Sequence, residues 1–262
     1  MRTSALYAHG CFSFIPDKSL CMKYESSNNN LIIKSRTMLR LQPVTPADKE
    51  VLSYIEDLYV KSFPIDERRP FEKLLELLGN SPVFHLRLLC DGDKKVGFIS
   101  YWQWPDLTYG EHFAVDPDER GGGYGGKALR LLCEEVQTPV VLEVELPFDE
   151  MSRRRIGFYL RSGFTLSTLP YIQPPYFDGA QPLELHLMFY ALPVPVESDA
   201  FSDFFCRVRD RLHRDVYGVE PGRYVLFEFC HVHDVFFVSA FPKSLCLGCI
   251  ASVGLRVMCL YR

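Results

Sequence analysis

A run of glycines in the middle of the chain carries the clearest sign of chemistry. Residues 116–135 read DPDERGGGYGGKALRLLCEE, so Arg120 is followed by five glycines in six positions and then by a helical pattern. Glycine has no Cβ, and a glycine loop therefore lets main-chain N–H groups turn toward a ligand. The first turn of the helix adds unpaired N–H donors and the positive end of the helix dipole. The segment predicts a phosphate-binding site.

Two nucleotide motifs fit part of this segment. Gly121, Gly123 and Gly126 satisfy the dinucleotide spacing GxGxxG, and Gly121 with Gly126 and Lys127 satisfies most of the P-loop GxxxxGK. The P-loop interpretation fails at Ala128, because a Ser or Thr hydroxyl should hold Mg²⁺ at that position. A glycine-rich surface loop without a ligand is a further interpretation.

The dinucleotide interpretation has acidic residues downstream, at Glu143 and Glu145, where a ribose partner is expected. It lacks room, because a full dinucleotide-binding domain needs more βαβ units than the remaining chain shows. A third pattern, Arg-x-x-Gly-x-Gly, is formed by Arg120, Gly123 and Gly125. This pattern has the strongest support from its context.

A second motif follows at a fixed distance. Residues 157–164 read GFYLRSGF. Together with Arg-x-x-Gly-x-Gly between a strand and a helix, it resembles the GNAT superfamily of acyl-CoA-dependent N-acetyltransferases over about residues 38–218. The resemblance implies that the glycine loop holds the pyrophosphate of coenzyme A and that Tyr159 lies beside the thioester. Tyr159 is then the candidate general acid, since a phenol is neutral at pH 7 and can donate a proton. A structural role as a core aromatic beside Phe158 stays open.

The resemblance also implies which residues bind acetyl-CoA as cosubstrate. The backbone of Val115 is expected to orient the thioester, and Lys127 or the arginines at 153–155 to reach the 3′-phosphate. No metal is expected in this chemistry. The full set of candidate coenzyme-binding residues is Val115, Arg120, Gly121, Gly123, Tyr124, Gly125 and Gly126.

The general base is chosen from acidic residues near the thioester. Glu111 is the first choice, because it lies four residues before Val115 on the strand expected to run beside the pantetheine arm. Glu143, Glu145 and His112 are the further candidates. Alternation along this strand predicts Tyr109, Glu111, Phe113 and Val115 on one face.

The periodicity predicts an α/β (α+β) fold with a mixed, mostly antiparallel sheet of about six to seven strands flanked by helices. Thr45 and Pro46 predict a helix start, and Pro64 predicts the end of that helix. Further helices are expected at 71–78, after the glycines, at 150–161 and at 198–217. Strands are expected at about 39–44, 83–90, 96–103, 108–115, 140–144, 164–169 and 183–190.

Two loops are expected to select the acceptor. They are Ser62–Arg69, with Phe63, Asp66 and Glu67 as candidate contacts, and Tyr171–Gly179. Solvated surface is the favoured interpretation for the two acids. The tyrosines of the second loop either contact the acceptor or cover the edge of the core.

The chain divides into four parts. Residues 1–37 are expected to be a poorly ordered extension, 38–196 the acetyltransferase domain, 197–218 a helix that packs on the domain or on a partner subunit, and 219–262 a tail of uncertain structure. Because the helix could pack on a partner subunit, the protein could also form a homodimer, and the sequence leaves this open. The tail carries Cys230-His-Val-His233 and Cys246-Leu-Gly-Cys249, whose spacing suits zinc, although an apolar tail without metal is the favoured interpretation.

Composition narrows the class of protein. The 262 residues are 47% hydrophobic, enough for a core, and 29 basic against 33 acidic residues argue against a nucleic-acid surface. Nine irregularly spaced cysteines and the absence of a signal-peptide pattern or long apolar run favour a cytoplasmic protein without a membrane span. The predicted function is an N-acetyltransferase acting on a primary amine of a small molecule or a protein. A non-catalytic acyl-CoA-binding domain and a dinucleotide-dependent oxidoreductase are the alternatives.

Overall fold

The computed structural model describes residues 38–224. The extension at 1–37 and the tail from 225 onward, with both cysteine- and histidine-containing motifs, lie outside the described residues. Expectations about their order, function and zinc binding stay predictions.

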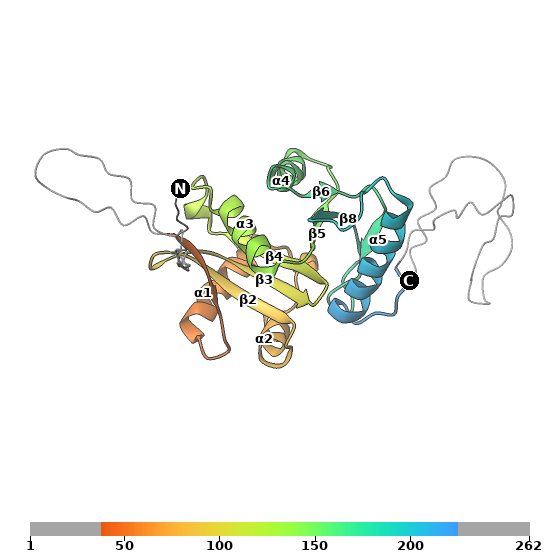
Figure 1. The fold of residues 1–262 in the computed structure, drawn as a ribbon. Coiled ribbons are helices and arrows are strands. Elements are labelled where there is room, and N and C mark those ends of the chain that lie inside the picture. Colours follow the sequence, from red (N-terminus) through yellow and green to blue (C-terminus); the bar gives the residue numbers. More distant parts are fainter. Residues whose placement is uncertain (1–37, 225–262) are drawn as a thin grey trace, which may run out of the picture. The chain divides into compact units, whose positions relative to one another are not determined.

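One sheet of eight strands forms the centre of the described chain (Figure 1). The strands follow the order β1-β2-β3-β4-β5-β8-β6, with β7 also paired to β8. All pairs are antiparallel except β4 with β5, which run parallel. This confirms the expected mixed sheet, with one short strand, β7, more than the prediction. The strands are β1 (Leu39–Pro43), β2 (Phe84–Asp91), β3 (Lys94–Trp104), β4 (Leu107–Val115), β5 (Val140–Glu145), β6 (Thr165–Leu166), β7 (Tyr171–Gln173) and β8 (Leu183–Tyr190).

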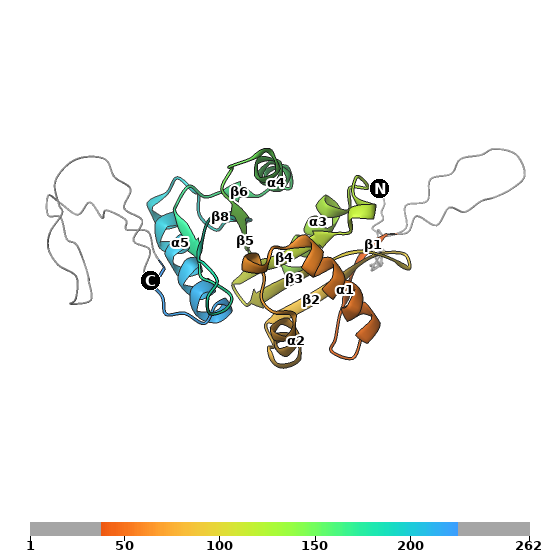
Figure 2. The same cartoon turned by 180° about the vertical axis from the view of Figure 1, so that it is seen from behind.

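Helices cover both faces of this sheet, and each face has its own apolar core. Helices α1, α2 and α5 contribute Ile55, Leu74 and Phe205 to one core, and α3 and α4 contribute Leu132 and Ile156 to the other. Figures 1 and 2 show α3 and α4 on the opposite side of the sheet from α1 and α2. Burial of each such side chain stabilises the fold by about 1.5–3 kcal/mol. The helices are α1 (Lys49–Ser62), α2 (Phe71–Asn80), α3 (Tyr124–Val136), α4 (Glu150–Arg161) and α5 (Asp199–Arg211).

The first helix begins later than its sequence predicts. The Thr45 N–H and hydroxyl both donate to the Asp48 carboxylate, at 2.8 and 2.7 Å, which closes a turn before the helix. Helix α1 therefore starts at Lys49 rather than at Pro46. Its end agrees with expectation, because Phe63 is extended, as a residue before a proline usually is.

A β-bulge interrupts β4 at the position that matters most for the site. Tyr101 of β3 pairs with Gly110 and Ser100 pairs with His112, so Glu111 has no partner of its own on β3. A bulge of this kind disturbs the alternation of side chains. Tyr109 and Ala114 consequently lie in the core under α1, whereas Phe113 packs against the core under α3. The prediction that Tyr109, Glu111, Phe113 and Val115 share one face was wrong for this reason.

Strands β4 and β5 then separate. Their parallel pairing covers only Thr108–Gly110 on β4 and Val140–Leu142 on β5, although β4 continues to Val115 and β5 to Glu145. We call the region between the two diverging ends the fork. Within residues 38–224, one edge of β4 therefore has no strand partner from residue 111 to residue 115.

The predicted C-terminal helix is confirmed, but its last turn is unusual. Helix α5 ends at Arg211 and continues as a π-turn, η3 (Leu212–Val216). Phe201 and Phe205 pack against Phe189 of β8, with ring centroids 5.6 and 6.5 Å apart. The helix thus packs on the sheet of its own chain and carries η3 back toward the fork.

Candidate active site

The glycine loop has the backbone that a phosphate site requires. Gly123 precedes α3 in a left-handed conformation, with φ 71°, and Gly121 has φ 88°. A Cβ built on Gly121 or on Gly126 meets no atom within 4 Å, so the space above both residues is open. In the described chain no hydrogen bond is found from the amides of residues 121–126 to the main chain outside α3. These amides are the unpaired donors of the loop and the first turn of α3.

Several contacts from β2, β3 and α1 fix this loop. The Asp116 carboxylate accepts from the Asp118 N–H and from the Tyr54 hydroxyl, both at 3.1 Å. The hydroxyl of Tyr124 donates to Asp91 at 2.7 Å, so its phenol points to the turn between β2 and β3. The Tyr124 hydroxyl is thus already paired, and only the main-chain amide of Tyr124 is one of the loop's unpaired donors. A loop tied in this way is prearranged for a ligand.

Gly125 joins the loop to α4. A Cβ on Gly125 would lie 3.1 Å from the Phe158 ring and 3.9 Å from the Phe113 ring. Only glycine lets the aromatic side chain of α4 approach this closely. The two sequence motifs, the glycine loop and the segment around Phe158 and Tyr159, are therefore in contact.

The unpaired edge of β4 presents amides to the fork. The Asp116 N–H donates to the Val96 carbonyl on β3 at 3.0 Å. Because successive N–H groups of a strand point to opposite edges, the Val115 and Phe113 amides are directed away from β3 and toward the fork.

Tyr159 of α4 is a half-buried phenol. Its ring packs between Phe158 and Phe164, at centroid distances of 5.1 and 5.7 Å. Burial raises the pKa of Tyr159 to about 12, so the phenol is neutral at pH 7. No hydrogen bond of its hydroxyl is found within residues 38–224. A neutral, unpaired hydroxyl can donate to a ligand.

Glu111 has a different environment from the one a general base requires. Its carboxylate forms an ion pair with Arg69 and accepts from Trp102 Nε1 at 3.0 Å, and its side chain is fully buried. Burial alone would raise the pKa of Glu111, but the charge of Arg69, the neighbouring His112 and the hydrogen bonds from Arg69 and Trp102 together outweigh burial and lower this pKa. The exposed part of Glu111 is therefore its main chain, at the edge of the fork.

Glu143 lies on the other arm of the fork, on β5, and is surrounded by phenols. Tyr109 and Tyr217 donate to its Oε2 at 2.8 Å, and Tyr171 donates to its Oε1. Burial raises the pKa of Glu143 to about 7, against the opposing effect of these three hydrogen bonds. A carboxylate with a pKa near neutrality can both accept and release a proton at physiological pH.

The remaining candidates for the general base, His112 and Glu145, are engaged in contacts with other side chains. His112 is buried against the Tyr59 hydroxyl at 3.3 Å, and burial lowers the pKa of His112 to about 4. Glu145 forms an ion pair with Arg155. Arg153 and Arg154 both pair with Glu150, whereas Arg120 and Lys127 are exposed cations without an ion pair among the described residues.

A pocket of about 330 Å³ lies between the two loops expected to select the acceptor. Ile65, Arg68 and Arg69 line it from the first loop and Phe177 lines it from the second. Arg69 also lies 4.9 Å below the Tyr176 ring, so the pocket borders the polar cluster at the fork. Its acidic wall is formed by Glu56 and Glu72.

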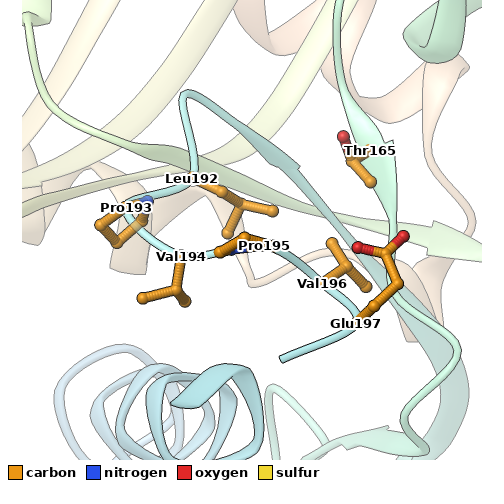
Figure 3. Close-up of a pocket in the computed structure, with 7 residues that line it drawn as sticks. All are labelled: Thr165, Leu192, Pro193, Val194, Pro195, Val196 and Glu197. Atoms are coloured by element: carbon orange, nitrogen blue, oxygen red, sulfur yellow. The ribbon is translucent and has the colours of Figure 1, made fainter. Parts of the chain in front are cut away.

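A second pocket, of about 400 Å³, lies elsewhere on the molecule (Figure 3). Thr165 and residues 192–197 line it, and Glu197 is its single charged side chain. None of the predicted site residues reaches it, and its apolar walls offer no group for acyl transfer.

Sequence reasoning missed much of the cluster at the fork. Tyr109 and Tyr171 lie on β4 and β7, whereas Arg69 precedes α2 and Tyr217 follows η3, and no local motif connects the four residues. One available signal was the tyrosine-rich second loop. No group of three His, Cys, Asp or Glu side chains suited to a metal occurs in the part of the chain that the structure describes.

Comparison with known proteins identifies the family. Residues 50–164 match the family model described as Acetyltransferase (GNAT) family. A structure from Bacteroides thetaiotaomicron assigned to the GNAT acetyltransferases is 43% identical, covers 69% of this chain and 99% of its own, and has a TM-score of 0.64. The chain therefore belongs to the GNAT family of acetyltransferases. No curated protein matches it.

Two more distant solved structures are also similar to this chain. The ribosomal-protein-S18-alanine N-acetyltransferase from Escherichia coli is 20% identical over 62% of this chain and 98% of its own, with a TM-score of 0.44. Arabidopsis thaliana NAA60 in complex with acetyl-CoA is 16% identical over 58% and 98%, with a TM-score of 0.46. None of the helices within residues 38–224 is long and apolar enough to cross a membrane.

Proposed function

We propose that this protein transfers an acetyl group from acetyl-CoA to a primary amine of a small molecule or a protein, by direct attack of the amine on the thioester. One observation carries the proposal: the unpaired edge of β4 runs into an open glycine loop, and that loop contacts α4 beside the neutral phenol of Tyr159. Acetyl-CoA supplies the activated acyl group, and the chain supplies binding, orientation and proton transfer.

The glycine loop fits a diphosphate. The amides of Gly121, Gly123, Tyr124, Gly125 and Gly126 provide donors at the positive end of α3, and the space above Gly121 and Gly126 is open. Hydrogen bonds to a charged group contribute about 1.5–3 kcal/mol each, so a few such amides outweigh any single side chain. The exposed Arg120 adds a cation at the same place.

Two groups serve the reacting thioester. The Val115 amide, directed into the fork, polarises the carbonyl as the donor of an oxyanion hole does. Tyr159 donates its proton to the sulfur as the carbon–sulfur bond breaks, and a neutral phenol suits that role.

Glu143 is the better base of the two carboxylates at the fork. Amine attack requires loss of the ammonium proton, and a base with a pKa near 7 accepts that proton at physiological pH. Glu111, held ionised by Arg69, has little proton affinity. We therefore assign Glu111 a structural role in holding β4 in place, and we assign the role of general base to Glu143.

The pocket beside the fork suits the acceptor. Glu56 and Glu72 place two carboxylates on its wall that can pair with an ammonium group. Of the two arginines on the wall, Arg69 is already paired with Glu111, and Arg68 remains as one opposing positive charge. The 330 Å³ of space fits a small amine or the end of a peptide chain.

The proposal is tested in two steps. Thermal unfolding with acetyl-CoA, NAD and ATP should show stabilisation by acetyl-CoA alone, and thiol release should then be followed with a panel of amines. Stabilisation without thiol release from any amine would indicate a non-catalytic acyl-CoA-binding domain. Stabilisation by NAD in place of acetyl-CoA would indicate an oxidoreductase.

A further inference from the structure

The carboxylate of Glu143 is enclosed by three tyrosine hydroxyls. Tyr109 and Tyr217 bond to Oε2 and Tyr171 bonds to Oε1, so three of its roughly four lone-pair sites are filled. Each of the three hydroxyls therefore already has a hydrogen-bonded path to this carboxylate. A proton can reach Glu143 through one of these phenols without displacing it.

The three phenols differ in access. Tyr109 is 0% exposed and Tyr171 is 1% exposed, whereas Tyr217 is partly exposed. The Tyr217 hydroxyl also lies 3.4 Å from that of Tyr176, which is partly exposed and stacks over Arg69 at the border of the acceptor pocket. Tyr176 and Tyr217 thus form a hydrogen-bonded path from the border of the pocket to Glu143.

The C-terminal π-turn holds Tyr217 in this place. The Tyr217 N–H donates to the Leu212 carbonyl at 3.2 Å, and the His213 ring bonds to the Ile172 carbonyl of β7 at 3.0 Å. The Val216 carbonyl accepts from Arg69 at 3.5 Å. Apart from Arg69, these residues follow the end of the family match at residue 164. The family match therefore does not include Tyr217.

We propose that Tyr217 relays the proton of the acceptor amine to Glu143, an assignment that rests on the proposed function. As an ammonium N–H bond breaks, its proton forms a bond to the Tyr217 oxygen, and the original Tyr217 proton passes to Glu143 Oε2. The ammonium becomes a neutral amine, the carboxylate becomes a carboxylic acid, and the phenol is regenerated. No further reactant is needed.

The charges around the relay favour this direction. Glu111 on β4 is compensated by Arg69 from the segment between α1 and α2, and His112 beside it is neutral. The pKa values of the phenols are raised by burial, so they carry protons and no charge. These phenols are Tyr109, Tyr171, Tyr176 and Tyr217.

The test compares Tyr217→Phe with Tyr171→Phe. Both variants remove one hydrogen bond to Glu143, so both should move the acidic limb of the kcat/KM profile upward by about one pH unit. Only Tyr217→Phe also breaks the relay, and it should lower the plateau above that limb by about 10²-fold. Tyr190→Phe, whose ring packs on Phe164 away from the fork, controls for loss of a surface phenol.

Each outcome decides a separate question. A plateau that falls in Tyr217→Phe but not in Tyr171→Phe supports the relay. Equal plateaus in the two variants, with thermal unfolding showing both folded, overturn it. If Tyr171→Phe does not fold, Tyr109→Phe takes its place, since it removes a buried donor from the same Oε2. A wild-type chain that releases no thiol with any amine overturns the proposed function itself.

Discussion

The Arg69 guanidinium and the Glu111 carboxylate form an ion pair in which the side chains are 10% and 0% exposed. This pair fastens the segment between α1 and α2 to the bulge of β4. Arg69→Met would leave a buried, unpaired carboxylate and should lower the free energy of unfolding by about 3–5 kcal/mol, measured by urea denaturation. Arg69→Met combined with Glu111→Leu should recover most of that loss. A double variant as unstable as the single one would contradict the account.

The two carboxylates of the fork should differ in catalysis. Glu143→Gln should lower kcat/KM near pH 7 by about 10²–10⁴, because the base is lost. Its residual rate should rise with pH as the amine loses its own proton. Glu111→Gln should keep the acidic limb of the wild-type profile, near the pKa of Glu143 of about 7. A limb that disappears in Glu111→Gln and survives in Glu143→Gln would reverse the assignment.

Tyr159→Phe removes the hydroxyl and keeps the ring packing between Phe158 and Phe164. We expect kcat to fall by up to about 10²–10⁴ and the affinity for acetyl-CoA, measured by calorimetry, to stay nearly unchanged. Full turnover by this variant would exclude Tyr159 from proton transfer to sulfur. Tyr190→Phe serves as the matched control.

Gly126 offers a sharp test of the phosphate site. Because a Cβ at Gly126 meets no protein atom within 4 Å, Gly126→Val should fold normally while its side chain fills space needed by the diphosphate. The affinity for acetyl-CoA should fall by at least the contribution of one charged hydrogen bond, about 10-fold or more. Gly79→Val, in α2 near Pro46, is the control outside the loop. Unchanged calorimetric affinity would show that the ligand does not approach Gly126.

Two buried groups should shape the pH dependence of stability in opposite directions. The pKa of His112 is lowered to about 4 in the folded protein. Its contribution to the free energy of unfolding is therefore complete above pH 6.5. This contribution is lost as the pH falls toward 4, because the unfolded chain then binds a proton that the native state does not bind. The pKa of Glu143 is raised to about 7, so its contribution to the free energy of unfolding is complete below pH 4.5 and is lost as the pH rises through 7.

Denaturation of the wild type and of His112→Asn separates these contributions. The stability advantage of the wild type over the variant should shrink by about 2 kcal/mol between pH 7 and pH 5. A constant difference across that range would mean that His112 titrates normally.

The sequence predicted the fold better than the site. Strong periodicity and end signals predicted α4 and β8 at their observed bounds, because local patterns determine such elements. The start of α1 was misplaced because Asp48 competes with Thr45 for the cap. The bulge at Glu111 has no local signature and changed the face of every later residue in β4.

The polar cluster at the fork could not be predicted from local spacing. Glu143 was among the base candidates, but its partner Tyr217 lies 74 residues away and arrives through the packing of α5. Arg69 and Glu111 are likewise 42 residues apart. Long-range pairs of this kind follow from tertiary packing, which single-sequence patterns do not contain.

The extra residue in β4 also governs how this segment tolerates length changes. Gly110 and His112 already lie opposite the neighbouring residues Tyr101 and Ser100, so a deletion of Glu111 would close the bulge without changing the partners of the residues that follow. Phe113 and Ala114 would stay on the sides of the sheet that they occupy now. A point substitution at Glu111 removes the carboxylate that meets Arg69 and Trp102 and keeps the bulge, whereas a one-codon deletion there would remove both.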